Sequence, residues 1–135
     1  MKVINSITIV HSASRNFKEA LDLCIETAKK ENIDVKNILP VNEKGIDKVV
    51  SKKESDLILV IGGDGTMIRS VANLIDHEIP LLGINIGKLG FLTDLNVDSI
   101  SKVLPEVFSG KYQLEERPSL SIQVDDSESL IGINE

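Results

Sequence analysis

An apolar run that stops abruptly at a glycine-rich turn constrains this chain more than any other feature. Residues 57–66 read Leu-Ile-Leu-Val-Ile-Gly-Gly-Asp-Gly-Thr. The uninterrupted run 57–61 is typical of a strand that is covered on both faces in a parallel sheet. A helical pattern follows from Thr66, so the segment predicts a strand, a tight turn and a helix N-terminus in succession.

Such a turn is suited to binding an anion. Glycines let the backbone come close to a phosphate, and the N–H groups of the first helical turn point toward it. Asp64 lies inside the turn. A carboxylate beside a phosphate is costly, because like charges repel, unless a metal ion or a hydroxyl awaiting deprotonation needs it, so the turn favours phosphoryl transfer. The structural alternative is a turn without a ligand, whose glycines merely supply positive φ angles.

The rest of the chain alternates strand and helix patterns. Strands are expected at 7–10, 35–39, 57–61 and 81–86, and helices at 17–31, at 46–53, from Thr66 and at 100–108. This order predicts an α/β fold with an open, mostly parallel sheet and helices on both faces. Ligands of such sheets bind at the carboxyl ends of the strands, which both glycine turns, 62–65 and 87–90, directly follow.

Helical spacing assigns several side chains to the core or to the surface. The helix after the glycine turn is expected to face inward with Met67, Ile68, Val71, Ala72 and Ile75. Arg69 falls on a different face, where exposure to solvent is expected. Cys24 lies in the apolar stripe of an earlier helix, where a buried, inert thiol is expected.

The character of the sequence changes from Tyr112. Residues 120–124 alternate apolar and polar side chains, 125–129 resemble a hairpin turn, and 130–133 begin a return strand. We therefore expect an α/β nucleotide-binding domain at 1–111 and, at 112–135, the first strands of an incomplete β-rich domain.

Composition narrows the classes of partner. The net charge of −6 argues against a surface for nucleic acid or for an acidic membrane. A single cysteine excludes an internal disulfide. The N-terminus has no signal-peptide pattern and no apolar stretch approaches the length of a membrane span, so the expected compartment is the cytoplasm.

Four motifs, in order, resemble those of NAD kinases. The turn 62–66 resembles their GGDGT signature, which diacylglycerol, sphingosine and 6-phosphofructokinases share more loosely. Residues 83–93, Gly-Ile-Asn-Ile-Gly-Lys-Leu-Gly-Phe-Leu-Thr, resemble the segment that distinguishes NAD kinases. Residues 115–120 are similar to the stretch that leads into their second domain, and 132–135, Gly-Ile-Asn-Glu, resemble their ALNE motif. The resemblance covers essentially the whole chain but only about the first half of a family member.

The resemblance implies an activity and a set of site residues. The activity is transfer of a phosphoryl group from ATP to the 2′-hydroxyl of the adenosine ribose of NAD, giving NADP, with Mg²⁺ accompanying ATP. Asp64 would be the general base. The phosphates of ATP would be bound by Gly62, Gly63, Gly65 and Thr66. NAD would be bound by Asp64, Gly65, Phe91, Asn134 and Glu135, with no dedicated metal ligand.

Each implied role has an alternative. Asp64 could be a helix-capping aspartate, Phe91 a core aromatic, and Asn134 and Glu135 a frayed terminus. The chain itself could be a catalytically inactive fragment that acts at most as a weak nucleotide-binding module, whereas full-length family members form homo-oligomers. A lipid or sugar kinase is disfavoured, because 67–74 lacks the asparagine–glutamate pattern that usually follows the turn in lipid kinases.

Overall fold

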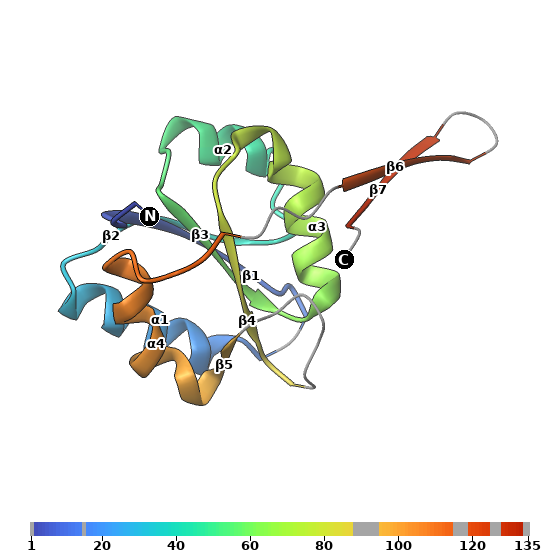
Figure 1. The fold of residues 1–135 in the computed structure, drawn as a ribbon. Helices are drawn as coiled ribbons and strands as arrows, with labels where there is room; N and C mark the ends of the chain where they lie inside the picture. The colour runs from blue at the N-terminus through green and yellow to red at the C-terminus, as the bar shows by residue number, and fades with distance from the viewer. Residues whose placement is uncertain (1, 15, 88–94, 115–118, 125–127, 134–135) are drawn as a thin grey trace.

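A five-stranded parallel sheet organises the chain (Figure 1). The computed structural model describes residues 2–14, 16–87, 95–114, 119–124 and 128–133. The strands are β1 (Ser6–His11), β2 (Asp34–Pro40), β3 (Leu57–Gly62), β4 (Leu81–Asn85) and β5 (Leu95–Asn96), in the order β2-β1-β3-β4-β5. The predicted open parallel sheet is confirmed. Strand β5 was not predicted, because two residues are too short to show a periodicity.

Helices cover both faces of the sheet, as predicted. They are α1 (Lys18–Lys30), α2 (Ile46–Lys52), α3 (Asp64–Leu74) and α4 (Ile100–Phe108), with short 3-10 turns at Ile75–His77 and Val97–Ser99. Helices α1 and α4 pack together on one face, and α2 and α3 lie on the other (Figure 1). None of the helices in the described ranges is long and apolar enough to span a bilayer.

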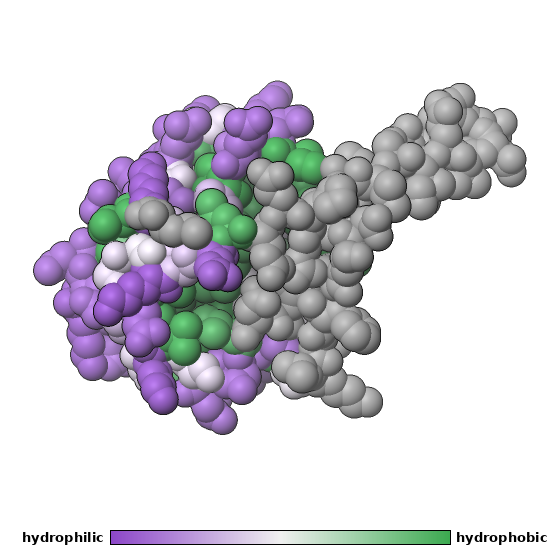
Figure 2. All heavy atoms as spheres, viewed as in Figure 1, coloured by the Kyte–Doolittle hydropathy of each residue, from purple (hydrophilic) through white to green (hydrophobic). Residues whose placement is uncertain are grey.

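Strand β3 explains why its sequence is apolar without interruption. Leu57, Leu59 and Ile61 belong to the core under α1 and α4, while Ile58 and Val60 belong to the core under α2 and α3. All five side chains are at most 4% exposed. Because successive side chains of a strand point to opposite faces, a central strand between two helical layers must be apolar at every position. Figure 2 shows hydrophilic residues at the margins of the same view and hydrophobic residues between them.

The strand order creates a switch point between β1 and β3. From β1 the chain crosses through α1 to β2 on one side, and from β3 it crosses through α3 to β4 on the other. At the carboxyl edge the Ser12 amide donates to the carbonyl of Ile61 over 2.8 Å, and the Ile86 amide donates to the carbonyl of Gly62 over 3.1 Å. Connections that leave neighbouring strands in opposite directions open a crevice at this edge, where ligands of doubly wound sheets bind.

A separate hairpin follows the α/β part. Strands β6 (Ser119–Val124) and β7 (Glu128–Ile133) pair antiparallel, and β7 contacts α3 (Figure 1). Both predicted strands are confirmed. Residues 128 and 129 were predicted to belong to the turn but are the first residues of β7, and 125–127 lie outside the described residues.

The inward face of α3 differs from the predicted stripe. Its buried residues are Met67, Ser70 and Leu74, whereas Ile68 is 39% exposed and Ala72 is also exposed. Ser70 is buried because its hydroxyl donates to the Thr66 carbonyl over 2.8 Å, which satisfies the polar group within the helix. The predicted stripe is right for Met67 and for Val71, which is partly buried against the core under α2 and α3, and wrong for Ile68 and Ala72. A spacing rule that counts only apolar side chains also passes over Ser70.

Candidate functional site

The glycine turn is the start of helix α3 itself. Strand β3 ends at Gly62, Gly63 is the N-cap in an extended conformation, and Asp64 is the first helical residue. The helix therefore begins earlier than the predicted Thr66. The first helical amides have no intrahelical acceptor, and an acidic residue in the first turn is favoured by the helix dipole.

The first amide groups of this turn lie at the N-terminal end of helix α3. The first intrahelical bond runs from the Met67 amide to the Gly63 carbonyl over 3.1 Å. The N–H groups of Gly65 and Thr66 precede that bond, so they lie at the N-terminus, where the helix dipole is positive. This arrangement is suited to holding a phosphate.

The three glycines of the turn have two different structural roles, neither of which is a positive φ. Among the glycines of the described residues, positive φ angles occur at Gly45, Gly87 and Gly110 and not in this turn, so the turn glycines do not supply the positive φ angles that the alternative required. A Cβ at Gly62 would lie 2.5 Å from Thr66 Oγ1. A Cβ at Gly63 or Gly65 would meet nothing within 4 Å. Gly62 is therefore required for packing, while Gly63 and Gly65 leave open space in front of the backbone.

A cleft of about 340 Å³ lies against this turn. It is lined by Ser12, Ala13, Ser14, Val41, Arg69 and the turn residues 63–66. These residues follow the carboxyl ends of β1, β2 and β3, so the cleft occupies the switch point of the sheet. The Val41 amide donates to the His11 carbonyl over 2.8 Å, which ties the loop after β2 to the end of β1.

Several lining residues were missed by the sequence analysis. Ser12, Ala13, Ser14 and Val41 carry no motif that marks them as site residues. Their available signal is their position directly after two strands, but that signal becomes specific only when the strand order places those strands beside β3.

Asp64 is half-buried on the wall of the cleft. Gly63 occupies the capping position of α3, so Asp64 is not the helix cap. Among the residues that line the cleft, Asp64 carries the one carboxylate and Arg69 the one basic side chain. Arg69 is exposed, as expected, yet it also lines the cleft.

The remaining predicted site residues either are not among those that line the cleft or lie outside the described residues. Gly62 lies at the base of the turn, but Phe91, Asn134 and Glu135 lie outside the described residues, as do residues 88–90 of the second glycine turn. His11, after β1, stacks on Phe17 with ring centroids 3.8 Å apart and an interplanar angle of 19°. The Nδ1 of His11 is 2.9 Å from the Ser12 carbonyl oxygen. Together the two contacts hold the imidazole against Phe17 and the backbone that follows β1.

Within the described ranges, no cluster of three or more His, Cys, Asp or Glu residues could hold a metal ion. A single carboxylate on the cleft fits Mg²⁺ that arrives with a nucleotide, since that ion takes its ligands mainly from phosphates and water and needs one or two protein carboxylates.

Comparisons with known proteins found relatives of this chain. The family described as "ATP-NAD kinase N-terminal domain" matches residues 6–112. An NAD kinase from Thiobacillus denitrificans is 49% identical over 71 residues, which cover 53% of this chain and 24% of the relative. An NAD kinase from Clostridium kluyveri is 38% identical over 100 residues, which cover 74% of this chain and 35% of the relative.

A solved structure supports the fold. A putative diacylglycerol kinase from Bacillus anthracis superposes with a TM-score of 0.53 at 18% identity, covering 79% of this chain and 43% of that one.

The matches to NAD kinases from Thiobacillus denitrificans and Clostridium kluyveri span 24% and 35% of those relatives. The family match extends from β1 through α4 and includes the cleft. This chain therefore belongs to the NAD kinase family.

Proposed function

We propose that this chain carries the phosphate-donor site and the general base of an enzyme that phosphorylates NAD with ATP. The observation that carries the proposal is the position of Asp64, in the first turn of α3 and on the wall of the switch-point cleft. The membership in the NAD kinase family supports the same reaction.

The proposed step has a simple balance of bonds and protons. The 2′-hydroxyl of the adenosine ribose of NAD loses its proton to the carboxylate of Asp64, and its oxygen attacks the γ-phosphorus of ATP. The bond between the γ-phosphorus and the bridging oxygen of ADP breaks, which gives NADP and ADP. General-base help of this kind typically contributes about 10²- to 10⁴-fold in rate.

The turn would hold the donor. The amides of Gly63, Gly65 and Thr66 and the Thr66 hydroxyl would bind its phosphates, in the open space in front of Gly63 and Gly65. Gly62 would act through packing against Thr66. Mg²⁺, when bound with ATP, would neutralise part of the phosphate charge.

Further NAD contacts are proposed from the family resemblance. Gly65, Phe91, Asn134 and Glu135 would contact NAD together with Asp64. We also propose the division into an α/β nucleotide-binding domain at 1–111 and the start of a β-rich NAD-binding domain at 112–135. The family match that ends at residue 112 supports this boundary.

A second candidate is a nucleotide-binding module without turnover. The observation that favours it is the coverage of 24% and 35% of the two NAD kinases described above. Its cleft would bind ATP without transfer of the phosphoryl group to NAD.

The test is NADP formation from NAD and Mg-ATP by residues 1–135, compared with Asp64→Asn. We expect the substitution to lower the rate by about 10²- to 10⁴-fold. The free energy of unfolding should change by about 1 kcal/mol or less, because the first-turn charge contributes little to the helix. Asp22→Asn, at an exposed position of α1, is the matched control.

Each result separates the candidates. Activity that disappears in Asp64→Asn and persists in Asp22→Asn supports the general base. Equal activity in Asp64→Asn and the parent chain overturns that role. Binding of ATP without NADP formation by the parent chain supports the module.

A further inference from the structure

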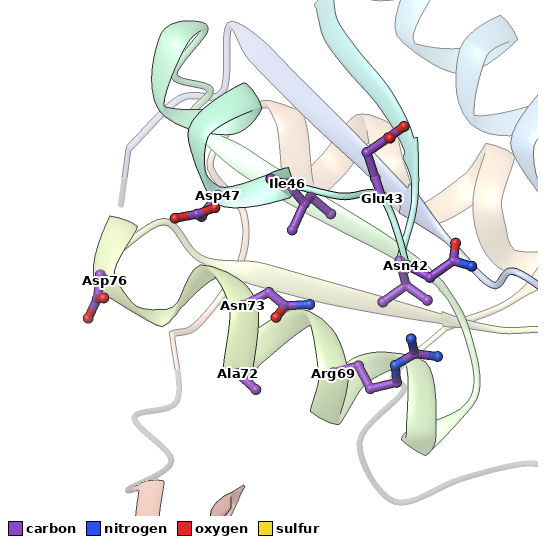
Figure 3. Close-up of a pocket in the computed structure, with 10 residues that line it drawn as sticks. Asn42, Glu43, Ile46, Asp47, Arg69, Ala72, Asn73 and Asp76 are labelled. Atoms are coloured by element: carbon purple, nitrogen blue, oxygen red, sulfur yellow. The ribbon is translucent and has the colours of Figure 1, made fainter.

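The end of strand β4 borders the glycine turn away from the open clefts. A second cleft, of about 560 Å³, lies between the loop after β2 and the second half of α3 (Figure 3) and shares Val41 and Arg69 with the first. None of the described residues that line the two clefts comes from β4. Strand β4 pairs with the other edge of β3, so its last residues approach the turn from the side opposite β1 and β2.

Asn85 is the last residue of β4 and the one polar side chain of this strand. It lies opposite Gly62 in the parallel register, and the amide of the next residue, Ile86, donates to the Gly62 carbonyl over 3.1 Å. Ile84 belongs to the core under α1 and α4. Because side chains alternate along a strand, Asn85 therefore faces the side of the sheet that α3 covers.

The side chain of Asn85 is poorly satisfied for a buried polar group. It is 4% exposed, and its Oδ1 accepts a hydrogen bond from none of the described residues. Its Nδ2 donates to the Gly87 carbonyl over 3.4 Å, which is long for a hydrogen bond. A buried amide in this state costs stability, whereas an apolar side chain of the same shape would not. A residue that breaks this rule beside a binding turn is typical of a functional constraint.

The contact that Asn85 makes leads to the second glycine turn. Gly87 begins that turn with a φ of 119°, a conformation that side chains other than glycine rarely adopt. Asn85 Nδ2 bonds to its carbonyl, and the Ile86 amide ties the same stretch to Gly62. These two bonds join the start of the second turn to the end of β3, where the first turn begins.

We infer that Asn85 is a positioning residue that holds the second glycine turn against the first. The inference rests on the proposed function, in which Phe91, directly after the second turn, contacts NAD and the first turn holds ATP. Asn85 fixes the direction in which the chain leaves β4 on its way to Phe91. It therefore acts on the affinity for NAD and not on the affinity for ATP.

The experiment uses Asn85→Leu, which keeps the approximate size of the side chain and removes both polar atoms. Asn85→Ala removes the same atoms without any risk of overlap. Hydrogen exchange, followed by NMR, compares the Ile86 amide with the Ser12 amide, which donates to the Ile61 carbonyl at the same edge without involving β4. Urea unfolding gives the global stability, and calorimetry gives the dissociation constants for NAD and Mg-ATP.

Thr8→Val is the matched control. Thr8 is a fully buried polar residue of β1 whose hydroxyl lies 2.6 Å from that of Ser55, away from both glycine turns. The substitution should lower stability, because the Ser55 hydroxyl loses this partner. It should change the affinity for neither nucleotide.

The expected pattern separates local order from global stability. Asn85→Leu leaves the urea midpoint unchanged or raises it, because the exposed Gly87 carbonyl can turn to water while no buried amide remains. In both Asn85 variants the Ile86 amide nevertheless exchanges about tenfold faster relative to the Ser12 amide. The dissociation constant for NAD rises by about tenfold, and that for Mg-ATP stays within about twofold.

Other patterns overturn the inference. These are unchanged exchange of the Ile86 amide, unchanged affinity for NAD, or equal losses of affinity for both nucleotides in the two Asn85 variants. Absence of NAD binding by the parent chain also overturns it. The proposed reaction is judged separately by NADP formation with Asp64→Asn. Binding of NAD that depends on Asn85, without NADP formation, would support this inference while the proposed reaction failed.

Discussion

The Cα of Gly62 lies directly against the side chain of Thr66. A Cβ placed at Gly62 would be 2.5 Å from Thr66 Oγ1 and 2.6 Å from Thr66 Cβ, both far below ordinary contact. The last residue of β3 therefore packs tightly against the first turn of α3. This packing holds the amides of the turn in a defined position at the edge of the sheet.

Substitutions at Gly62 and Gly65 should have opposite effects. Gly62→Ala should lower the free energy of unfolding by about 1–3 kcal/mol, because the new methyl group overlaps Thr66. Gly65→Ala should raise it by up to about 1 kcal/mol, because the position is helical and open, yet it should weaken ATP binding by placing a methyl group where phosphate would lie. Urea unfolding and calorimetry measure the two effects.

A double substitution tests the cause of the Gly62 effect. Thr66→Gly removes the atoms that the new Cβ would meet, so Gly62→Ala should cost much less in that background. Additive losses of stability would contradict the packing explanation.

The inward face of α3 leads to a second stability prediction. Leu74→Ala should lower the free energy of unfolding by about 2–5 kcal/mol, because Leu74 is 1% exposed in the core under α2 and α3. Ile68→Ala should cost less than about 1 kcal/mol, because Ile68 is 39% exposed. Chemical denaturation of both variants is the measurement, and a larger loss for Ile68→Ala would return the helix to the orientation predicted from sequence.

Cys24 should be chemically silent in the folded protein. Its side chain is fully buried, and burial raises the pKa of the thiol to about 12. The reactive thiolate is therefore scarce and inaccessible at pH 8. A chromogenic disulfide reagent should label the chain slowly in buffer and rapidly in urea, and fast labelling of the folded chain would contradict the buried position. Cys24→Ala provides the blank.

Asp56 should make stability depend on acidic pH. Partial burial acts to raise the pKa of its carboxyl, but a 2.8 Å hydrogen bond from Lys2 Nζ and others from the amides of Asn5 and Ser6 outweigh it, so the pKa lies below its usual value. The stabilising effect is complete above the unfolded-state pKa of about 3.9 and is lost as the pH falls through the folded-state pKa.

Removing the charge at Asp56 isolates this effect. Asp56→Asn should lower the free energy of unfolding at pH 7 by about 1–3 kcal/mol, and the difference from the parent chain should shrink as the pH is lowered toward the folded-state pKa. Urea unfolding across that range is the measurement. Asp34→Asn, whose carboxylate is exposed and pairs with Lys36 at 3.1 Å, should have little effect at any pH. A pH-independent difference for Asp56→Asn would exclude the carboxylate as its cause.

The sequence by itself determined most of the helices and strands and the glycine turn. The run 57–61 specified a central strand, because only a strand covered on both faces requires apolar side chains at every position. The glycine turn and the helical pattern after it are local, so they could be read without knowing what packs against them. The repeated strand–helix order then determined the fold class.

Tertiary structure decided what surrounds the turn. Ser12 and Val41 reach the site because the strand order places β1 beside β3 and a hydrogen bond joins the loop after β2 to the end of β1. The inward face of α3 depends on Ser70, whose hydroxyl is satisfied within its own helix. Strand order and burial depend on contacts between segments far apart in the chain, whereas hydrophobic periodicity and turn chemistry describe only neighbouring residues.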